Sequence, residues 1–549
     1  MKTNHIKRCL LILISTCIQL ITSAQTIQWS NRIGGNNTDT GMAGCCDSAG
    51  NFYFAGMFWS PGCAFQKITL GRNGINDLFI VKYNTDGKEV WVRQIGNDNP
   101  YWSESIKIFY NTVSHHLFIV GKFSGTIQMG TSSLTSSGMT DIFFSKYSLD
   151  GQCIWAKKVG GAGEDGNSCL AFDDQGNIYM SGTGSQSMNF GGFTIPKGGF
   201  LAKFDPEGNC IWAKNKFEWI PFFNSQIRPV GLKILGPDIL LGGCMGADTI
   251  IHVDTLLISH PGYGSSLICC FDSTGMAKWI REGISKITES ISGISIDDEG
   301  NIFHSGYFKD TIVFSGNVLT STPGKREMFL VSYNKYGQFR WARPTLGGNY
   351  AEGYDLTATR DGRVAVVGYF RGLVQFGQFQ VQSLSGEDMF IAGYDSLGNC
   401  LGVSNFANSY GTGICDDPAG NLYFTCLFNP STTIGSQPYT SYGALDIVVA
   451  KCSAITGIGG PEPWEEERLM IYANPTTGKC TVTLPAALQH ETDLMLRVFD
   501  SGGRQVGEYL LDQSAGKIQL NVEALAQGIY QVVVSGGGKV YSGKVVFKK

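Results

Sequence analysis

Acidic residues recur at one position of a repeated pattern, and a set of this kind can attract a cation. In three units an acid stands eleven residues before the glycine of an Asp/Asn/Gly turn. The residues at this position are Asp39, Glu104, Asp165, Gln226, Glu289 and Ser409, with Glu352 one position out of register. If they rim a central channel, Asp39, Glu104, Asp165 and Glu289 form an incomplete carboxylate ring that would bind a cation or a basic peptide. The alternative is that each carboxylate binds a loop amide of the neighbouring unit.

The other ionisable residues form no recognisable catalytic or metal-binding pattern. None of the seven histidines is near an obvious Ser or Cys nucleophile. Turns such as "DDQGN" and "DDEGN" lack the alternating ligands of a calcium loop, and aspartates that bind their own turn amides explain them. The sequence therefore predicts no catalytic residues, no metal site and no cofactor.

The chain is rich in cysteines. One short motif occurs as "GQCIW", "GNCIW" and "GNCLG", and its cysteine is Cys153, Cys210 and Cys400 in turn. Because equivalent positions of different repeats lie far apart, we expect these three cysteines to act as small apolar residues. There is no CxxC pair, which argues against a zinc cluster. One or two disulfides among the others remain possible, with Cys45, Cys46, Cys415 and Cys426 as candidates.

A short motif built around one tryptophan marks the repeated unit that must position these residues. It recurs about every 60 residues, a period typical of solenoids and propellers. Its tryptophans are Trp29, Trp91, Trp155, Trp212, Trp279 and Trp341, and Gly402 stands at the seventh position. We expect one indole ring per unit, wedged between neighbouring sheets.

Each unit contains four short runs that alternate like β-strands, separated by Asp, Asn and Gly turns. A four-stranded antiparallel sheet cannot bury both of its faces alone, so the units must stack. The third run appears seven times, and the last copy has no fourth run after it. An unpartnered tryptophan strand at 26–34 balances the count. The sequence thus predicts an all-β fold, a seven-bladed β-propeller closed by its N-terminal strand.

The N-terminal segment has the pattern of a secretory signal peptide. Basic residues precede the apolar run "CLLILISTCIQLI", and small residues then lead to Gln25. The run is too short for a membrane span. The net charge is −4 and no basic block follows, which argues against a nucleic-acid partner. We therefore expect a signal peptide at 1–24 and no transmembrane segment once it is removed.

The repeat resembles β-propeller repeats of secreted Gram-negative proteins, a resemblance specific for fold and weak for function. The C-terminal part, "LMIYANPTTGKCTVTL" onward, resembles the type A sorting domain of the type IX secretion system. The matching residues are Tyr472, Asn474, Pro475, Gly478, Asp500, Gly503, Arg504, Gly528, Ile529, Tyr530, Lys548 and Lys549, with Ala473 where proline is usual. The expected domains are the propeller at 25–455, a linker at 456–468 and a small β-sandwich at 469–549.

The resemblance implies recognition by the type IX machinery, passage across the outer membrane, and release or attachment to surface lipopolysaccharide. We expect a non-enzymatic binding or adhesion module for a glycan or a protein. The alternatives are a polysaccharide-acting enzyme that uses the channel mouth and a structural envelope component. Aromatic residues in loops, among them Trp59, Trp102 and a cluster at 217–223, either bind a partner or cap the core.

Overall fold

The computed structural model describes residues 26–72, 76–97, 106–218, 228–246, 249–260, 264–285, 290–384, 386–454, 470–472, 475–484, 488, 494–500, 505–511, 517–536 and 539–548. The chain divides into two units, Met1–Ile458 and Gly459–Lys549. The expected signal peptide and the whole of the expected linker lie outside the described residues. No helix in the described part of the chain has the length and apolar character needed to cross a membrane.

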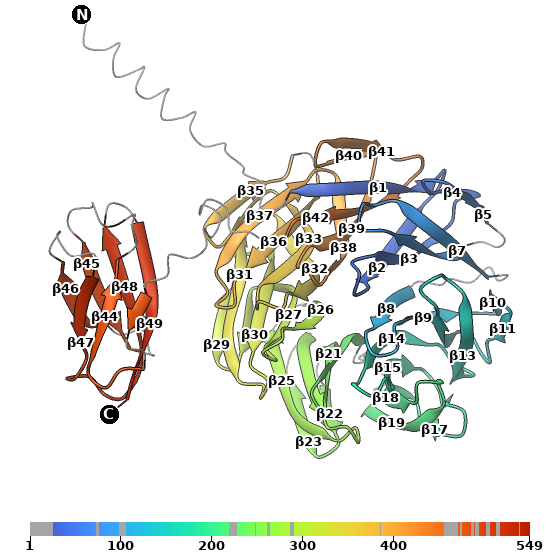
Figure 1. The fold of residues 1–549 in the computed structure, drawn as a ribbon. Coiled ribbons are helices and arrows are strands. Elements are labelled where there is room, and N and C mark those ends of the chain that lie inside the picture. The colour runs from blue at the N-terminus through green and yellow to red at the C-terminus, as the bar shows by residue number, and fades with distance from the viewer. Residues whose placement is uncertain are drawn as a thin grey trace, which may run out of the picture. The chain divides into compact units, whose positions relative to one another are not determined.

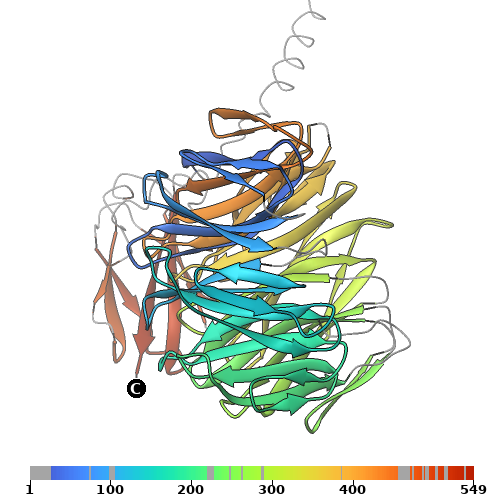
Figure 2. The same cartoon turned by 90° about the vertical axis from the view of Figure 1, so that its right-hand side faces the viewer.

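The larger unit is a ring of antiparallel sheets, which Figure 1 shows from one side and Figure 2 after a quarter turn. Seven sets of four strands are present among the described residues, which confirms the propeller. From the inner to the outer strand, blade one consists of β2 (Asp39–Cys46), β3 (Phe52–Phe58), β6 (Asp77–Tyr83) and β7 (Glu89–Asn97), and blade two of β8 (Ile106–Asn111), β9 (His116–Phe123), β12 (Asp141–Tyr147) and β13 (Cys153–Gly161). Blade three consists of β14 (Asp165–Phe172), β15 (Ile178–Gly184), β18 (Gly198–Phe204) and β19 (Cys210–Glu218). Blade four consists of β20 (Arg228–Leu235), β21 (Asp238–Gly246), β24 (Gly264–Phe271) and β25 (Ala277–Ser285).

The remaining three blades complete the ring. Blade five consists of β26 (Ser290–Ile296), β27 (Ile302–Lys309), β30 (Arg326–Tyr333) and β31 (Phe339–Gly347). Blade six consists of β32 (Tyr350–Ala358), β33 (Val364–Arg371), β36 (Asp388–Tyr394) and β37 (Cys400–Phe406). Blade seven consists of β38 (Ser409–Asp416), β39 (Leu422–Phe428), β42 (Asp446–Cys452) and β1 (Ile27–Gly35). Short turns join the first strand to the second in every blade and the third strand to the fourth in six blades. Their glycines adopt positive φ, for example +82° at Gly300, which explains why glycine closes each Asp/Asn turn.

The N-terminal strand closes the ring as the sequence predicts. In Figure 1 the blue strand β1 runs beside β42, in the part of the ring formed by the end of the unit. The two strands are antiparallel, with Ile33 opposite Ile447 and Ile27 opposite Cys452. Blade seven therefore combines three strands from the end of the unit with one from its beginning.

The segment between the second and third strands of each blade forms a β-hairpin, which the sequence had indicated only as a Gly/Ser/Thr-rich excursion. In five blades this hairpin pairs with the outer strand of the preceding blade. The hairpins are β4 (Gly62–Ala64) and β5 (Thr69–Gly71), β10 (Thr126–Met129) and β11 (Ser132–Thr135), β16 (Met188–Asn189) and β17 (Thr194–Ile195), β28 (Thr311–Phe314) and β29 (Asn317–Thr320), and β34 (Leu373–Phe376) and β35 (Phe379–Gln382). Two further hairpins, β22 (Thr249–Val253) with β23 (Leu256–His260) and β40 (Ser431–Ile434) with β41 (Gln437–Thr440), form separate two-stranded sheets.

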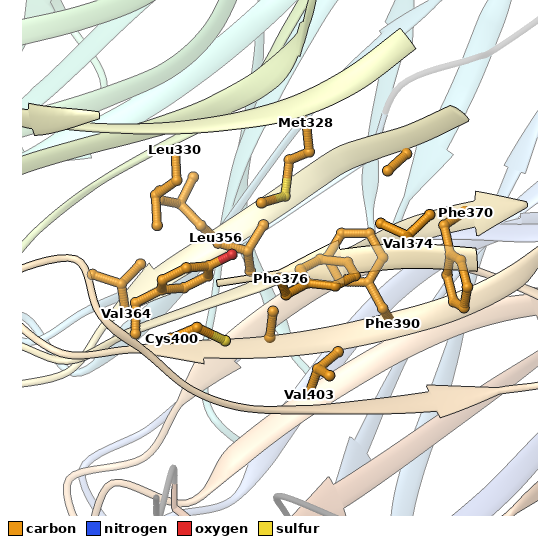
Figure 3. Close-up of a cluster of buried hydrophobic side chains, with 14 of the residues drawn as sticks. Met328, Leu330, Leu356, Val364, Phe370, Val374, Phe376, Phe390, Cys400 and Val403 are labelled. Atoms are coloured by element: carbon orange, nitrogen blue, oxygen red, sulfur yellow. The ribbon is translucent and has the colours of Figure 1, made fainter. Parts of the chain in front are cut away.

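Hydrophobic cores lie between adjacent blades. Figure 3 shows the core between the fifth and sixth blades, where Met328 and Leu330 of one blade meet Leu356, Phe376 and Phe390 of the next. Each of the seven interfaces has such a cluster, including the one between blades seven and one, where Ile33 packs with Phe52 and Phe79. Closing the ring thus buries apolar surface that an open array would expose.

Each tryptophan of the repeat contacts a turn of the next blade, which confirms the expected wedge. Trp341 is 7% exposed, and its indole Nε1 donates to the carbonyl oxygen of Ser396 at 2.9 Å. The guanidinium of Arg343 stacks over the same indole and donates to Gly398 O at 2.9 Å. The receiving turn always joins the third and fourth strands of its blade.

Glycine recurs in the second strand of most blades because other atoms of the same blade approach it closely. A Cβ on Gly368 would lie 1.9 Å from the carbonyl oxygen of Glu352 and 2.9 Å from the ring of Phe390. Both neighbours belong to the same blade. The close approach is therefore made by the bulged inner strand and by an aromatic side chain of the third strand.

The C-terminal unit is a small β-sandwich. One sheet has the order β43 (Met470–Tyr472), β44 (Lys479–Thr483) and β47 (Lys517–Asn521), and the other β46 (Gln505–Leu510), β45 (Met495–Phe499), β48 (Gly528–Gly536) and β49 (Lys539–Phe547). Side chains from both sheets, such as Val482 and Val532, share one core. This is the layer architecture that the alternating runs predict.

Candidate functional site

The structure places Asp39 and Asp165 between blades rather than on an open rim. Both side chains are completely buried. The Asp39 carboxylate accepts hydrogen bonds from Gly35 N at 2.6 Å and from the Ser60 hydroxyl at 2.8 Å. Asp165 accepts one from Gly161 N at 2.6 Å. The expectation of a solvent-facing carboxylate rim is therefore corrected at these two positions, because the carboxylates bind amides of the preceding blade's last strand.

Glu104 and Glu289, the other two predicted rim residues, lie outside the described residues. The sequence reasoning missed a second set of acids, at the start of the third strand. Members of this set are Asp77, Asp141, Glu327, Asp388 and Asp446. At two blade interfaces they face the predicted acids: Asp141 faces Asp165, and Asp446 faces Asp39. Burial, opposed by the Gly161 N–H and reinforced by Asp141, raises the pKa of Asp165 to about 7.

A cluster of tyrosines and charged residues lies where the inner strands of blades six and seven begin. We call it the tyrosine patch: Tyr307, Arg326, Tyr350, Glu352, Tyr354, Tyr369, Glu387 and Tyr410. Glu352, the acid that is out of register in the sequence, lies in it. Its Oε1 accepts from Arg326 Nη1 at 3.0 Å, and its Oε2 accepts from the Tyr369 hydroxyl at 2.7 Å. Arg326 also lies 5.4 Å from the ring centre of Tyr307, in a cation–π contact.

A second carboxylate organises the other side of the tyrosine patch. Glu387 accepts hydrogen bonds from the hydroxyls of Tyr350 and Tyr410. The bond from Tyr350 lowers the pKa of Glu387 despite partial burial, so this carboxylate is ionised at neutral pH. Burial, and then the neighbouring carboxylates, raise the pKa of Tyr350, Tyr369 and Tyr410, so their hydroxyls stay protonated donors.

The rings of the tyrosine patch touch one another. Tyr369 is central: its ring centre lies 5.4 Å from that of Tyr410, 6.0 Å from that of Tyr350 and 6.4 Å from that of Tyr354. Tyr354 is 36% exposed, and the other rings are half-buried. Three blades thus supply aromatic faces and ionised groups to one partly open surface.

These tyrosines are not required by the repeat. The residue that follows the second-strand glycine is tyrosine in blades five and six only, at Tyr307 and Tyr369. The other blades have Met57, Lys122, Thr183, Cys244 and Leu427 there. Since the same sheet forms with five other side chains, the fold does not explain why two tyrosines occupy this position. The sequence signal that could have located the patch is this departure from the repeat.

An open hollow of about 220 Å³ lies at the opposite ends of the same inner strands. It is lined by turn residues of blades six and seven, among them Arg360, Arg363, Asp361 and Asp417. Its lining combines charged side chains with small residues such as Ala419 and Gly420, and includes no aromatic ring. We favour the tyrosine patch as the candidate site because it combines apolar faces with fixed hydrogen-bonding groups.

The histidines and aspartate turns have structural surroundings. His304 is buried among Phe314, Phe329 and Tyr333, and burial lowers its pKa to about 3. In the turn after β2, Asp47 accepts from the backbone N–H groups of Ala49 and Asn51, both at 2.9 Å. The aspartates therefore bind their own turn amides, as expected. Within the described residues, no group of three or more His, Cys, Asp or Glu is placed to hold a metal.

The expected loop aromatics divide between core and undescribed segments. Phe217 is buried in the core between blades three and four, and Trp59 packs against the core between blades one and two. Trp102 and residues 219–223 lie outside the described residues.

Several motif residues of the C-terminal unit have clear structural roles. Tyr530 is buried, and its hydroxyl donates to Ala526 O at 2.6 Å. A Cβ on Gly478 would lie 2.6 Å from the side chain of Glu523, so this position favours glycine. Pro475 is exposed, Asp500 directly follows β45, and Tyr472, Gly528 and Ile529 lie in strands. Asn474, Gly503, Arg504 and Lys549 lie outside the described residues.

Comparison with known families identifies the C-terminal unit. Residues 470–548 match a family model described as a secretion system C-terminal sorting domain. The match confirms the resemblance stated from the motif. The protein thus falls in the class of exported β-propellers with a type IX sorting domain, secreted or exposed at the outer surface of a Gram-negative bacterium of the Bacteroidetes type.

The propeller has distant relatives. A WD repeat-containing protein of Acanthamoeba polyphaga mimivirus is 23% identical over 381 residues, which cover 59% of this chain and 24% of the relative. The regulatory protein FlaEY of Caulobacter vibrioides is 22% identical over 346 residues, covering 56% of this chain and 36% of the relative. The chain thus matches about a quarter to a third of the length of these relatives.

Solved structures with similarity to the chain include the Neurospora crassa Pan2 WD40 domain, with 8% identity and a TM-score of 0.38 over 76% of this chain and 91% of that one. A tryptophan variant of the Synechocystis apocarotenoid oxygenase has 10% identity and a TM-score of 0.37 over 78% and 94%. Similarity at this level does not bear on ligand or activity.

Proposed function

We propose that the propeller is a non-enzymatic binding module that holds a carbohydrate chain at the tyrosine patch. This proposal is supported by the exposed or half-buried rings of Tyr354, Tyr369 and Tyr410, which lie beside the carboxyl groups of Glu352 and Glu387. Aromatic rings stack against the apolar face of a sugar, and carboxylates accept hydrogen bonds from its hydroxyls. Fixed side chains of this kind lose little conformational entropy on binding.

The protonation states of Glu387 and of the tyrosines in the tyrosine patch favour binding over catalysis. A general acid for glycoside cleavage needs a carboxyl whose pKa is raised toward neutrality. Glu387 instead has a lowered pKa, held by the Tyr350 hydroxyl. The tyrosines have raised pKa values and are poor bases at neutral pH. These groups suit a site that orients hydroxyls without transferring protons.

The sorting domain supplies the location of this binding module. We infer that the type IX machinery recognises residues 469–549, that cleavage falls in the 456–468 linker, and that the propeller is then released or joined to surface lipopolysaccharide. Mass spectrometry of the protein from culture supernatant and from the cell surface tests this, because a chain that retains residues 470–548 in both fractions contradicts the cleavage.

Binding is tested with the full-length chain and a panel of bacterial and host polysaccharides in isothermal titration calorimetry. Tyr354→Ala should weaken binding about tenfold, the equivalent of about 1.4 kcal/mol. Tyr336→Ala is the matched control, since Tyr336 is 65% exposed in a turn at the other end of its blade. Equal affinities of the two variants contradict the tyrosine patch as the site.

Other outcomes of the same screen favour the alternatives. Release of new reducing ends or unsaturated sugars from a bound polysaccharide would show an enzyme. Binding to a protein but to none of the polysaccharides would contradict the carbohydrate ligand. Self-association without a soluble ligand would favour a structural envelope component.

A further inference from the structure

Two cysteines meet where the first and last blades of the ring lie side by side. Cys46 is the last residue of β2, the inner strand of blade one, and Cys415 lies near the end of β38, the inner strand of blade seven. Their Sγ atoms are 3.6 Å apart, although the residues are 369 positions apart in sequence. A disulfide needs about 2.05 Å between the sulfurs, so the two sulfurs must approach each other by about 1.5 Å.

The neighbouring cysteine belongs to a different environment. Successive side chains of a strand point to opposite faces. Cys45 packs against the core between blades one and two, whereas Cys46 and Cys415 pack against the core between blades seven and one. Cys426, the other candidate in the sequence, is completely buried in the core between blades six and seven. The geometry therefore selects one of the pairs that the sequence left open.

Oxidants can reach this pair. Cys46 and Cys415 are both half-buried rather than enclosed. Cys415 directly precedes Asp416 and Asp417, which line the open hollow at this end of the inner strands. An exported chain also passes through an oxidising compartment, where disulfides form and persist.

We propose that Cys46 and Cys415 form a disulfide that locks the ring. The two thiols lose two protons and two electrons, and a sulfur–sulfur bond forms between them. The electrons pass by thiol–disulfide exchange to the disulfide of a dithiol oxidoreductase, which is reduced to two thiols. The bridge joins blades one and seven at their inner strands, while β1 and β42 join them at the outer edge of blade seven.

The bridge gives the ring a closure that does not depend on the N-terminal strand. Without it, blades seven and one are held by non-covalent contacts, among them the β1–β42 ladder, the pairing of β4 with β1, the hydrogen bond from the Thr412 hydroxyl to Gly41 O and a shared core. A bridge across so long a loop strongly restricts the unfolded chain, although strain can offset part of this gain. The oxidised protein should therefore resist heat better than the reduced protein.

The test uses the full-length chain equilibrated with a mixture of oxidised and reduced glutathione. Alkylation of the remaining thiols after denaturation should label two fewer cysteines than in the reduced protein. Peptide mass spectrometry should find the Cys46 peptide linked to the Cys415 peptide. The melting temperature should fall by about 5 °C on reduction.

Matched variants separate the two neighbouring cysteines. Cys46→Ser and Cys415→Ala should each abolish the linked peptide and the effect of reductant on melting. Cys45→Ser should keep both. Loss of the link in Cys45→Ser but not in Cys46→Ser would overturn the proposed pairing. A full set of alkylated cysteines in the equilibrated wild-type protein would overturn the bridge itself.

Discussion

The indole Nε1 of Trp29 donates a hydrogen bond to the carbonyl oxygen of Thr85 at 3.0 Å. Trp29 lies in the strand that completes blade seven, and Thr85 lies in the turn between the third and fourth strands of blade one. The contact repeats between blades one and two, where Trp91 donates to Leu149 O at 3.1 Å. It repeats again between blades five and six through Trp341 and Ser396. The junction that closes the ring therefore uses the same interaction as junctions inside it.

The glycine of the receiving turn should be intolerant of substitution. Gly87 has a φ of +77°, and a Cβ there would lie 2.4 Å from Cδ2 of Trp29. Gly87→Ala should cost about 3 kcal/mol, from the left-handed backbone and the displaced indole together. The measurement is the midpoint of urea unfolding.

Gly191→Ala is the control for backbone strain. Its φ is +75°, but nothing lies within 4 Å of the added Cβ. This variant should lose only about 1 kcal/mol. If both alanine variants shift the midpoint equally, packing of Trp29 on the turn contributes nothing.

A tryptophan introduced at Gly402, where the seventh copy of the motif lacks one, should not make the contact that the other tryptophans make. The indole of each outer strand needs the turn between the third and fourth strands of the next blade. For Gly402 the next blade is blade seven, whose third strand β42 and fourth strand β1 are not joined by a turn. Gly402→Trp should therefore bring no gain in stability, whereas Trp341→Ala should cost about 3–4 kcal/mol.

Chemical unfolding of the two variants checks this explanation, with Trp212→Ala as a comparison. Trp212 is half-buried, whereas Trp341 is 7% exposed, so Trp212→Ala should cost less than Trp341→Ala. A clear gain in stability from Gly402→Trp would show that the indole does not need the turn.

The carboxyl of Asp165 should make stability fall as pH rises. Burial and Asp141 raise its pKa from 3.8 to about 7 in the folded chain. A raised folded-state pKa means that its contribution is fully present below about pH 4 and is lost as pH rises through about 7. The loss is at most about 4 kcal/mol, since one pKa unit corresponds to about 1.4 kcal/mol. The groups facing it are Asp141, whose carboxylate pairs with Lys158, and Glu164, which pairs with Lys122.

Melting temperatures of Asp165→Asn and the wild type, compared between about pH 4 and about pH 8, measure this effect. The variant should gain on the wild type as pH rises. Asp173→Asn is the control: burial opposes ionisation of Asp173, but hydrogen bonds from Asn177 and the charge of Lys203 outweigh it and lower its pKa below 3.8. Its contribution is lost only below about pH 4, so this variant should run parallel to the wild type between about pH 4 and about pH 8. Parallel curves for Asp165→Asn and the wild type would contradict the prediction.

Removal of residues 26–35 should open the ring at one edge. The deletion takes away Ile33 and leaves β42 without its outer partner, so a sheet edge and the core around Phe52 become exposed. The shortened chain should melt at lower temperature and aggregate. A synthetic peptide of residues 26–35 should restore part of the stability, and a scrambled peptide should not. Unchanged melting of the shortened chain would show that closure does not stabilise the fold.

The sequence by itself determined the repeat, the strand order and the closure. Turn glycines, alternating apolar runs and the recurring tryptophan depend on local geometry that is the same in every unit, so they are visible in the order of residues. Counting unpartnered strands placed β1 beside β42, and the motif near Pro475 and Gly478 identified the sorting domain. These signals are periodic or contiguous.

Only the tertiary structure decided which side chains meet across blades. The repeat predicts that Asp39 and Asp165 rim a channel, yet each is buried beside a backbone amide of the preceding blade and a second acid. The tyrosine patch joins positions from 307 to 410, and Cys46 meets Cys415 although 369 positions separate them in the sequence. Such contacts depend on how adjacent sheets pack side by side, and no periodicity along the chain encodes that packing.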